Sequence, residues 1–497
     1  MGGIKQLAGQ TIWYGLSSIA GRFLNYLLTP LLLTLFASVA YGKISTLFAI
    51  AAFLNIIYSY GMETAYFRFA AREPEEKVFQ TAGTSLISST ILFSLLLFMA
   101  SGSIARFLEI PDKPEYVQWV VVIVALDTLA VLPFARLRHK ARPRKYAFIK
   151  ILNIVTNIAL LLFFLVLCKN APAGSWLQEL YSPAIGLGYV LLANVAASAL
   201  TLLLLVQEWK DFRTKVDPAF LKEMLLYSWP LIIVGFGGMV NEMIDRFMLL
   251  KLYPGGTNAA YAQSGIYSAN YKLAVLIVLF IQAFRLGAEP FFFRQSTQAN
   301  APQTYARVMK FFVLACCLCF LGVTLFLDVW KYFMGRAHPE YWTGLKVVPI
   351  LMLAKLFLGV YYNLSVWYKL TNRNLTGAWI TLAGAGITVL INFLFIPTYG
   401  YMACAFATLA CYGFMMATSY LLGQRHYPIP YNVKRISGYV LAAVLLYLLH
   451  QLLLPLYPAL WYRLATGVLL TGSFVVGVAI IEKEELRGLP VVGRYFR

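Results

Sequence analysis

The chain has 497 residues, of which 60% are hydrophobic and only 12% are charged, and its formal net charge at pH 7 is +20. A chain of this length would ordinarily form several soluble domains, but so few charged residues cannot cover the surfaces of such domains. The composition therefore excludes a soluble protein and indicates a membrane protein.

Runs of about 20 apolar residues recur along the whole chain, each long enough to cross about 30 Å of hydrocarbon as an α-helix. We predict an all-α polytopic membrane protein with about fourteen transmembrane helices. The predicted spans are residues 11–35, 44–69, 81–102, 117–138, 147–168, 183–206, 226–251, 265–290, 305–327, 345–368, 376–396, 401–422, 436–454 and 461–481. The connections between the spans are short, so no extramembrane domain is expected.

The basic residues follow the predicted topology. Most of them, including the run RLRHKARPRK at 136–145, fall in alternate connections between spans. By the positive-inside rule both termini are cytoplasmic. The net charge is thus explained by topology, and no nucleic-acid partner is expected. The six cysteines lie in or at the ends of spans, where they are expected to pack as small residues, so no disulfide and no metal site is predicted.

Polar side chains form stripes on several spans. A helical period gathers them onto one face of span 1 (Thr11, Ser18, Arg22, Asn25, Thr29), span 2 (Asn55, Ser59, Glu63), span 5 (Lys150, Asn153, Asn157) and span 8 (Gln282, Arg285, Glu289). An ionised side chain near the bilayer centre costs about 2.5–3.5 kcal/mol on insertion scales. These stripes should therefore face other helices or water, and we favour a wet cavity for Arg22 and Arg285.

Span 7 reads NEMIDRFML and holds three charged residues. Glu242 precedes Arg246 by one helical turn, in the order that favours an intrahelical ion pair. Asp245 has two possible roles: it could carry coupling protons, or it could pair with Lys272 on span 8.

The stretch GMETAYFR at 61–68 is echoed by GAEPFFFR at 287–294, which aligns Glu63 with Glu289 and Arg68 with Arg294. The echoed segments lie on spans 2 and 8, so the two halves of the chain enter the membrane in the same direction. Parallel repeats of this kind place a substrate site between them. We predict an N-terminal lobe at 1–225, a C-terminal lobe at 226–430, and two further helices with a cytoplasmic tail at 431–497.

The four echoed charges lie toward the cytoplasmic ends of their spans. They are predicted to form two copies of a cytoplasmic gate, one in each lobe. The alternative for Arg68 and Arg294 is that they anchor the helices by reaching to the membrane interface.

An excess of fixed positive charge in a chamber within the membrane favours an anionic cargo, and arginine in particular offers paired donors to phosphate. The chain has no glycine-rich phosphate loop, so ATP is not expected as the direct energy source and no cofactor is predicted.

At this point the sequence resembles the polysaccharide-transporter, or Wzx-type, flippases of the multidrug/oligosaccharidyl-lipid/polysaccharide exporter superfamily. The resemblance rests on KQLAGQTIWYGLSSIAGRFLNYLLTPLLL at 5–33, YGMETAYFRF at 60–69, DRFML at 245–249 and SGIYSANYKLAVL at 264–276.

This resemblance implies two lobes around a cationic cavity, alternating access, and transfer of an undecaprenyl-diphosphate-linked oligosaccharide across the cell inner membrane for polysaccharide synthesis. It implies that Arg22, Arg246 and Arg285 contact the diphosphate, with Lys272 and Asn25 as further cavity residues. Membrane lipids, a coupling proton or sodium ion and a polysaccharide polymerase are the expected partners, and the protein is not expected to be an enzyme.

Three other functions stay open. Lipid II flippases also carry basic residues in their first spans. Drug/cation antiporters of the same superfamily share the layout, but many of them use a carboxylate in span 1, where this chain has none. A membrane polymerase or ligase would commonly display its catalytic residues in a large exoplasmic loop, and the predicted exoplasmic loops here are short.

Overall fold

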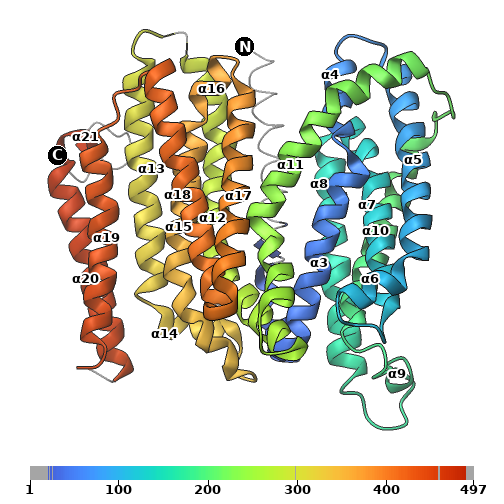
Figure 1. The fold of residues 1–497 in the computed structure, drawn as a ribbon, viewed down its shortest axis with the longest axis horizontal. Helices are drawn as coiled ribbons and strands as arrows, with labels where there is room; N and C mark the ends of the chain where they lie inside the picture. The colour runs from blue at the N-terminus through green and yellow to red at the C-terminus, as the bar shows by residue number, and fades with distance from the viewer. Residues whose placement is uncertain (1–20, 22, 25, 297, 457–458, 488–497) are drawn as a thin grey trace. The chain divides into compact units, whose positions relative to one another are not determined.

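The computed structural model describes residues 21, 23–24, 26–296, 298–456 and 459–487 (Figure 1). These residues form helices and no strand, and thirteen of the helices are long and apolar enough to cross a membrane. The prediction of an all-α polytopic membrane protein is confirmed. Most of the predicted first span lies outside the described residues, and α2 (Thr29–Leu35) is its end.

The chain divides into two compact units. The first comprises Met1–Ala269, Gly335–Tyr341 and Ala378–Cys411, and the second comprises Asn270–Met334, Trp342–Gly377 and Tyr412–Arg497. The bounds of these units differ from those of the predicted lobes, because parts of the chain after residue 225 pack with the N-terminal half. The lobe division at residue 225 stays a prediction.

The first unit contains most of the N-terminal helices. They are α2, α3 (Ser38–Ser59), α4 (Met62–Phe69), α5 (Glu75–Met99), α6 (Ser101–Phe107), α7 (Pro114–His139), α8 (Pro143–Leu162), the π-helix η1 (Phe163–Cys168), α9 (Trp176–Glu179), α10 (Gly188–Leu205), the 3-10 helix η2 (Val206–Trp209) and α11 (Pro218–Leu252). Helix α7 packs against α3, α5 and α10 and is mostly buried. Its inward face brings Val117, Val120 and Val124 against Leu47 of α3 and Leu191 of α10.

Four elements are shared between the two units. They are α12 (Thr257–Gln295), the 3-10 helix η4 (Pro339–Val347), α17 (Asn374–Tyr399) and α18 (Tyr401–His426). The second unit also contains α13 (Ala301–Thr324), α14 (Leu327–Trp330), the 3-10 helix η3 (Lys331–Met334), α15 (Val348–Leu364), α16 (Val366–Leu370), α19 (Val433–Leu453), α20 (Leu460–Ile481) and α21 (Lys483–Arg487). Helix α13 packs against α15 and α19, and α20 packs against α19.

The span predicted at 44–69 is two helices instead of one. Tyr60 and Gly61 both adopt positive φ angles, 30° and 72°, which end α3 and start α4 in a new direction. Glycine tolerates this conformation because it has no Cβ atom. A Cβ atom on Gly61 would also lie only 3.1 Å from the carbonyl oxygen of Ser228 on α11, so the break is packed tightly against a neighbouring helix.

Helix α11 begins with a side-chain cap. The Asp217 carboxylate accepts a hydrogen bond from the backbone N–H of Phe220 at 3.1 Å, and Pro218 occupies the first turn. Both features favour a helix start. Near this start Phe69 of α4 packs edge-on against Phe220 and Tyr227, so α4 lies against the first turns of α11.

Candidate functional site

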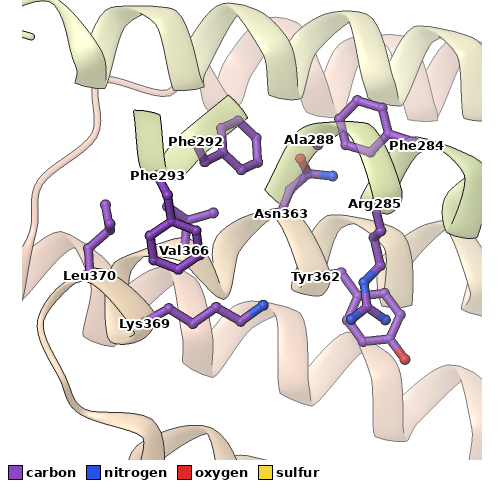
Figure 2. A pocket seen from close by; sticks show the side chains of 10 residues that line it. All are labelled: Phe284, Arg285, Ala288, Phe292, Phe293, Tyr362, Asn363, Val366, Lys369 and Leu370. Atoms are coloured by element: carbon purple, nitrogen blue, oxygen red, sulfur yellow. The ribbon is translucent and has the colours of Figure 1, made fainter. Parts of the chain in front are cut away.

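A pocket in the second unit contains Arg285, one of the predicted cavity residues (Figure 2). Its lining comes from α12, α15 and α16 and consists of Phe284, Arg285, Ala288, Phe292, Phe293, Tyr362, Asn363, Val366, Lys369 and Leu370. The guanidinium carbon of Arg285 lies 4.1 Å from the centre of the Tyr362 ring. Figure 2 shows the Lys369 side chain extending toward Tyr362 and Arg285. We call this the Arg285 pocket.

The Arg285 pocket is lined by basic side chains. The described residues that line it include two basic side chains and no carboxylate. Its free volume is about 10 Å³, which is close to the space of one water molecule. The pocket in this conformation is therefore too narrow for a phosphate, and an anion bound there would require the lining helices to move apart. Lys369 lies between two predicted spans, so no sequence pattern selects it. Only the structure shows that it lines the same pocket as Arg285.

Arg246 lies in a different environment. It is 3% exposed, and its Nη1 donates to the Asp245 carboxylate at 2.6 Å and to the backbone carbonyl of Glu242 at 2.5 Å. Its guanidinium also lies 5.4 Å from the centre of the Tyr267 ring. Asp245, for which two roles were left open, is thus the recorded ion-pair partner of its neighbour on α11.

The other predicted residues lie in several places. Lys272 is half-buried on α12. Arg22 and Asn25 lie outside the described residues. Glu289 and Arg294 belong to α12, but their side chains also lie outside the described part of the structure.

The N-terminal copy of the predicted cytoplasmic gate makes contacts within the first unit. Glu63 forms an ion pair with Arg138 of α7. The guanidinium of Arg68 lies 4.2 Å from the centre of the Tyr227 ring on α11. These contacts connect α4 to two neighbouring helices. The proposed equivalence with the second copy stays a prediction.

Two charged residues in the middle of spans form a second polar region, inside the first unit. Ser198 of α10 donates a hydrogen bond to the Asp127 carboxylate of α7 at 2.7 Å, and Lys150 of α8 interacts electrostatically with the same carboxylate. Asp127 and Lys150 are both exposed. Lys150 projects from α8 on the side opposite the exposed apolar residues Phe148 and Val155, as a rotation of 100° per residue requires. Its ammonium lies 4.2 Å from the centre of the Phe134 ring on α7, so it is directed toward that helix.

Two glycines bring α3 and α12 into direct contact within the first unit. A Cβ atom on Gly42 would lie 2.0 Å from the backbone oxygen of Tyr261, and one on Gly265 would lie 1.9 Å from the backbone oxygen of Ser38. No side chain fits at either position. The Ser45 hydroxyl donates to the Ser268 hydroxyl at 2.7 Å in the same contact.

Polar contacts join the same ends of the helices. Lys251 donates to Glu109 at 3.0 Å, Thr257 also donates to Glu109, and Tyr261 donates to the backbone oxygen of Leu108. The α2–α3 connection is held as well, since the Tyr341 hydroxyl donates to the backbone oxygen of Phe36 at 2.7 Å and Glu340 accepts from the Ser38 N–H at 3.1 Å.

Each of these contacts joins a residue of the predicted N-terminal lobe to a residue of the predicted C-terminal lobe. All of them lie at the ends of helices that the sequence predicts to be exoplasmic. We call them the interlobe contacts. They hold these helix ends together within the first unit.

Comparison with protein families gives a match over residues 7–296 to the family described as "Polysaccharide biosynthesis protein". The match covers more than half of the chain. The chain belongs to this family. The comparison with curated proteins found no match at the sequence level.

Solved structures of transporters share the fold of this family member. The lipid II flippase MurJ in an inward closed conformation has a TM-score of 0.69 and 13% identity, covering 96% of this chain and 100% of MurJ. An inward-facing multidrug resistance MATE family transporter of the MOP superfamily has a TM-score of 0.61 and 13% identity, with coverage of 86% and 95%. The MATE multidrug transporter DinF-BH, solved as a complex, has a TM-score of 0.57 and 14% identity, covering 86% of this chain and 96% of DinF-BH.

At these identities the likeness concerns the fold. The predicted resemblance to the polysaccharide flippases of the MOP superfamily is confirmed by the family and the fold together, and the chain is a multi-pass membrane protein. The solved structures that share its fold include transporters and a flippase.

Proposed function

We propose that this protein is a flippase that moves an undecaprenyl-diphosphate-linked oligosaccharide from the cytoplasmic to the outer leaflet of the cell inner membrane by alternating access. The family supports a role in polysaccharide synthesis, and the fold supports transport. The observation that supports an anionic cargo is the Arg285 pocket, where two basic side chains from membrane-spanning helices line one site.

In this proposal Arg285 and Lys369 bind the diphosphate. A guanidinium presents paired N–H donors that match phosphate oxygens, and an ammonium adds a second positive charge. Stacking on Tyr362 holds the Arg285 guanidinium in place while the helices move. Arg22, Arg246, Lys272 and Asn25 remain proposed cavity residues, and Arg246 would first have to leave Asp245.

In this proposal the interlobe contacts belong to the state of the transport cycle in which the exoplasmic side is closed. With both termini cytoplasmic, the contacts between α3 and α12 and around Glu109 lie on the exoplasmic side and prevent release there. Opening must separate the glycine contact and break the Glu109–Lys251 ion pair. Glu63, Arg68, Glu289 and Arg294 are the proposed cytoplasmic gate, and Asp245 and Glu242 are the proposed coupling residues for a proton or sodium ion.

The test is export by the chain with Arg285→Ala and Lys369→Ala, expressed in cells that lack the native gene. We expect surface polysaccharide to fall at least about tenfold, since each substitution removes a charge-assisted bond of about 1.5–3 kcal/mol. Glycan-loaded carrier lipid should accumulate in the cytoplasmic leaflet. The matched control is Arg72→Ala with Arg144→Ala, which removes two exposed charges and should export normally.

Other results would favour other functions. Accumulation of lipid II on depletion would favour a lipid II flippase, which the similarity of fold to MurJ makes the second candidate. Loss of polymer length, while single repeat units still reach the surface, would favour a polymerase or ligase. Drug resistance that depends on the chain would favour an antiporter. Normal export by the double variant would refute the role of the Arg285 pocket.

A further inference from the structure

A second pocket opens in the second unit where α13 and α19 begin. Its volume is about 450 Å³, and its lining consists of Asn300, Gln303, Thr304, Ala306, Arg307, Lys310, Pro430, Asn432, Arg435, Ile436 and Glu485. Figure 1 shows α21, which carries Glu485, beside α13 and α19 at this end of the unit. None of its lining residues belongs to the Arg285 pocket. We call it the α13–α19 pocket.

The α13–α19 pocket has a positive lining. Three of the described lining residues are cations, Arg307, Lys310 and Arg435, and one is a carboxylate, Glu485. Behind the lining lies Glu482, which is 1% exposed and accepts a hydrogen bond from Lys310 at 2.5 Å. Counting both carboxylates, three positive charges face two negative ones, so the pocket keeps a net positive charge.

The two arginines retain hydrogen-bond donors for a ligand. The recorded hydrogen bond of the Arg307 side chain runs from Nε to Glu485 at 3.2 Å, and its side chain is 62% exposed. Arg435 places Nη1 3.6 Å from Glu482, and its side chain is half exposed. Because a guanidinium has five N–H groups, each arginine has donors beyond the one that contacts its carboxylate and can bind a phosphate oxygen.

Two exposed apolar helices adjoin this pocket. Helix α19 begins at it, and α20 ends at Ile481 just before α21, which carries the lining residue Glu485. Both helices are long and apolar enough to span a membrane, and both are mostly exposed in the structure. Acyl chains can therefore lie against these helices next to the cations.

We infer that the α13–α19 pocket binds the phosphate headgroup of an anionic phospholipid, with Arg307 and Arg435 donating to the phosphate and the acyl chains against the exposed apolar helices α19 and α20. A basic pocket between helices at the end of their apolar spans lies at the height of lipid headgroups. The adjoining apolar helices favour a lipid over a free phosphate ion, which would gain nothing from them. By the predicted topology this is the cytoplasmic leaflet. A bound phosphate competes with Glu485 for Arg307.

The experiment measures lipid binding to the purified full chain by native mass spectrometry. The chain in detergent is titrated with phosphatidylglycerol, with phosphatidylcholine and, separately, with phosphatidylglycerol in the presence of inorganic phosphate. We expect phosphatidylglycerol to bind more tightly than phosphatidylcholine, and Arg307→Gln with Arg435→Gln to weaken its binding about tenfold or more. The control, Arg373→Gln with Arg425→Gln, removes two exposed charges of the same unit and should bind as the unmodified chain does.

A third variant tests the site by gain of binding. Glu485→Gln removes the carboxylate that competes with the phosphate, so its affinity for phosphatidylglycerol should rise a few-fold, a result that misfolding cannot produce. Equal binding by the Arg307/Arg435 variant and its control would overturn the inference. So would equal binding of the two lipids. Displacement of the lipid by millimolar inorganic phosphate would show an anion site that does not recognise lipid, and would overturn it as well.

Discussion

Three ion-paired cations of the first unit and the cations of the Arg285 pocket differ in the contacts that surround them. In the first unit Arg246 has Asp245, Lys251 has Glu109 and Arg138 has Glu63, so each cation is neutralised by a carboxylate of the same chain. In the Arg285 pocket one neighbour of Arg285 is the face of Tyr362, and the described lining residues include a second cation, Lys369. A ring face stabilises a cation without cancelling its charge.

This difference separates two uses of a charge within a membrane. A neutralised pair can hold helices together, whereas a cation against an aromatic ring keeps the charge that an anionic cargo needs. The four predictions below test this contrast, beginning with the largest expected effect.

Asp245→Asn should strongly destabilise the protein. It leaves Arg246, which is 3% exposed, without its carboxylate, and an uncompensated buried charge costs about 3–5 kcal/mol. We expect a lower melting temperature in detergent and less protein in the membrane. The double variant Asp245→Asn with Arg246→Met removes both charges and should recover most of the stability. If the single variant melts like the unmodified chain, Arg246 is neutralised by other means.

Gly42→Val should prevent the interlobe contacts from closing. The new side chain would meet the backbone oxygen of Tyr261, and overpacking of this kind costs about 1–3 kcal/mol. We expect export to fall and Ser45→Cys to become more reactive toward a membrane-impermeant maleimide added outside the cell. Gly102→Val on α6 is the matched control, because no atom lies within 4 Å of the added Cβ. Unchanged labelling in Gly42→Val would mean that this end is not a gate.

Arg285→Lys should reduce export moderately without changing stability. The positive charge stays, but the flat stacking on Tyr362 and the paired donors are lost, an effect of about 0.5–2 kcal/mol. Export should therefore lie between that of the unmodified chain and that of Arg285→Ala, with an unchanged melting temperature. A drop in melting temperature as large as that of Asp245→Asn would place Arg285 among the structural charges and remove the contrast.

Acid should weaken the Glu109 contact by a small amount. The hydrogen bond from Thr257, followed by that from Lys251, holds the pKa of Glu109 below its ordinary value. A lowered pKa in the folded state means that the stabilisation is present above the ordinary pKa and is lost as the pH falls through the lowered one. Because both side chains are about one-third exposed, the effect should stay below about 1 kcal/mol.

The measurement is the difference in melting temperature between the unmodified chain and Glu109→Gln. The difference should be present near neutral pH and should shrink below about pH 4. A difference that is independent of pH would show that the ionised carboxylate does not stabilise this contact.

Hydrophobicity and charge distribution were sufficient to predict the class of fold and most spans, because length and apolarity are local properties of the sequence. The break at Tyr60 and Gly61 was missed, because an unbroken apolar run gives no sign of two consecutive positive φ angles. Arg285 was selected from its polar stripe. Lys369 was not, since its distance from Arg285 depends on how α12 and α16 pack.

Contacts between residues that are far apart in the chain could also not be predicted from the sequence. Glu109 and Lys251 are each unremarkable at the end of a predicted span, and only the tertiary structure brings them within 3.0 Å. Asp245 was considered for pairing with Lys272 on the next span, while its recorded partner is the adjacent residue. Helical periodicity indicates which residues share a face, but it does not decide between several partners of opposite charge.

The close approach of α3 and α12 at Gly42 and Gly265 has a mechanical consequence. Dispersion between backbone atoms in direct contact decays so steeply that a gap of about 0.5–1 Å already forfeits a quarter to a half of the attraction. Such a junction resists small displacements and then releases abruptly. We therefore expect the contact between α3 and α12 to be either fully formed or fully separated, without stable intermediate distances.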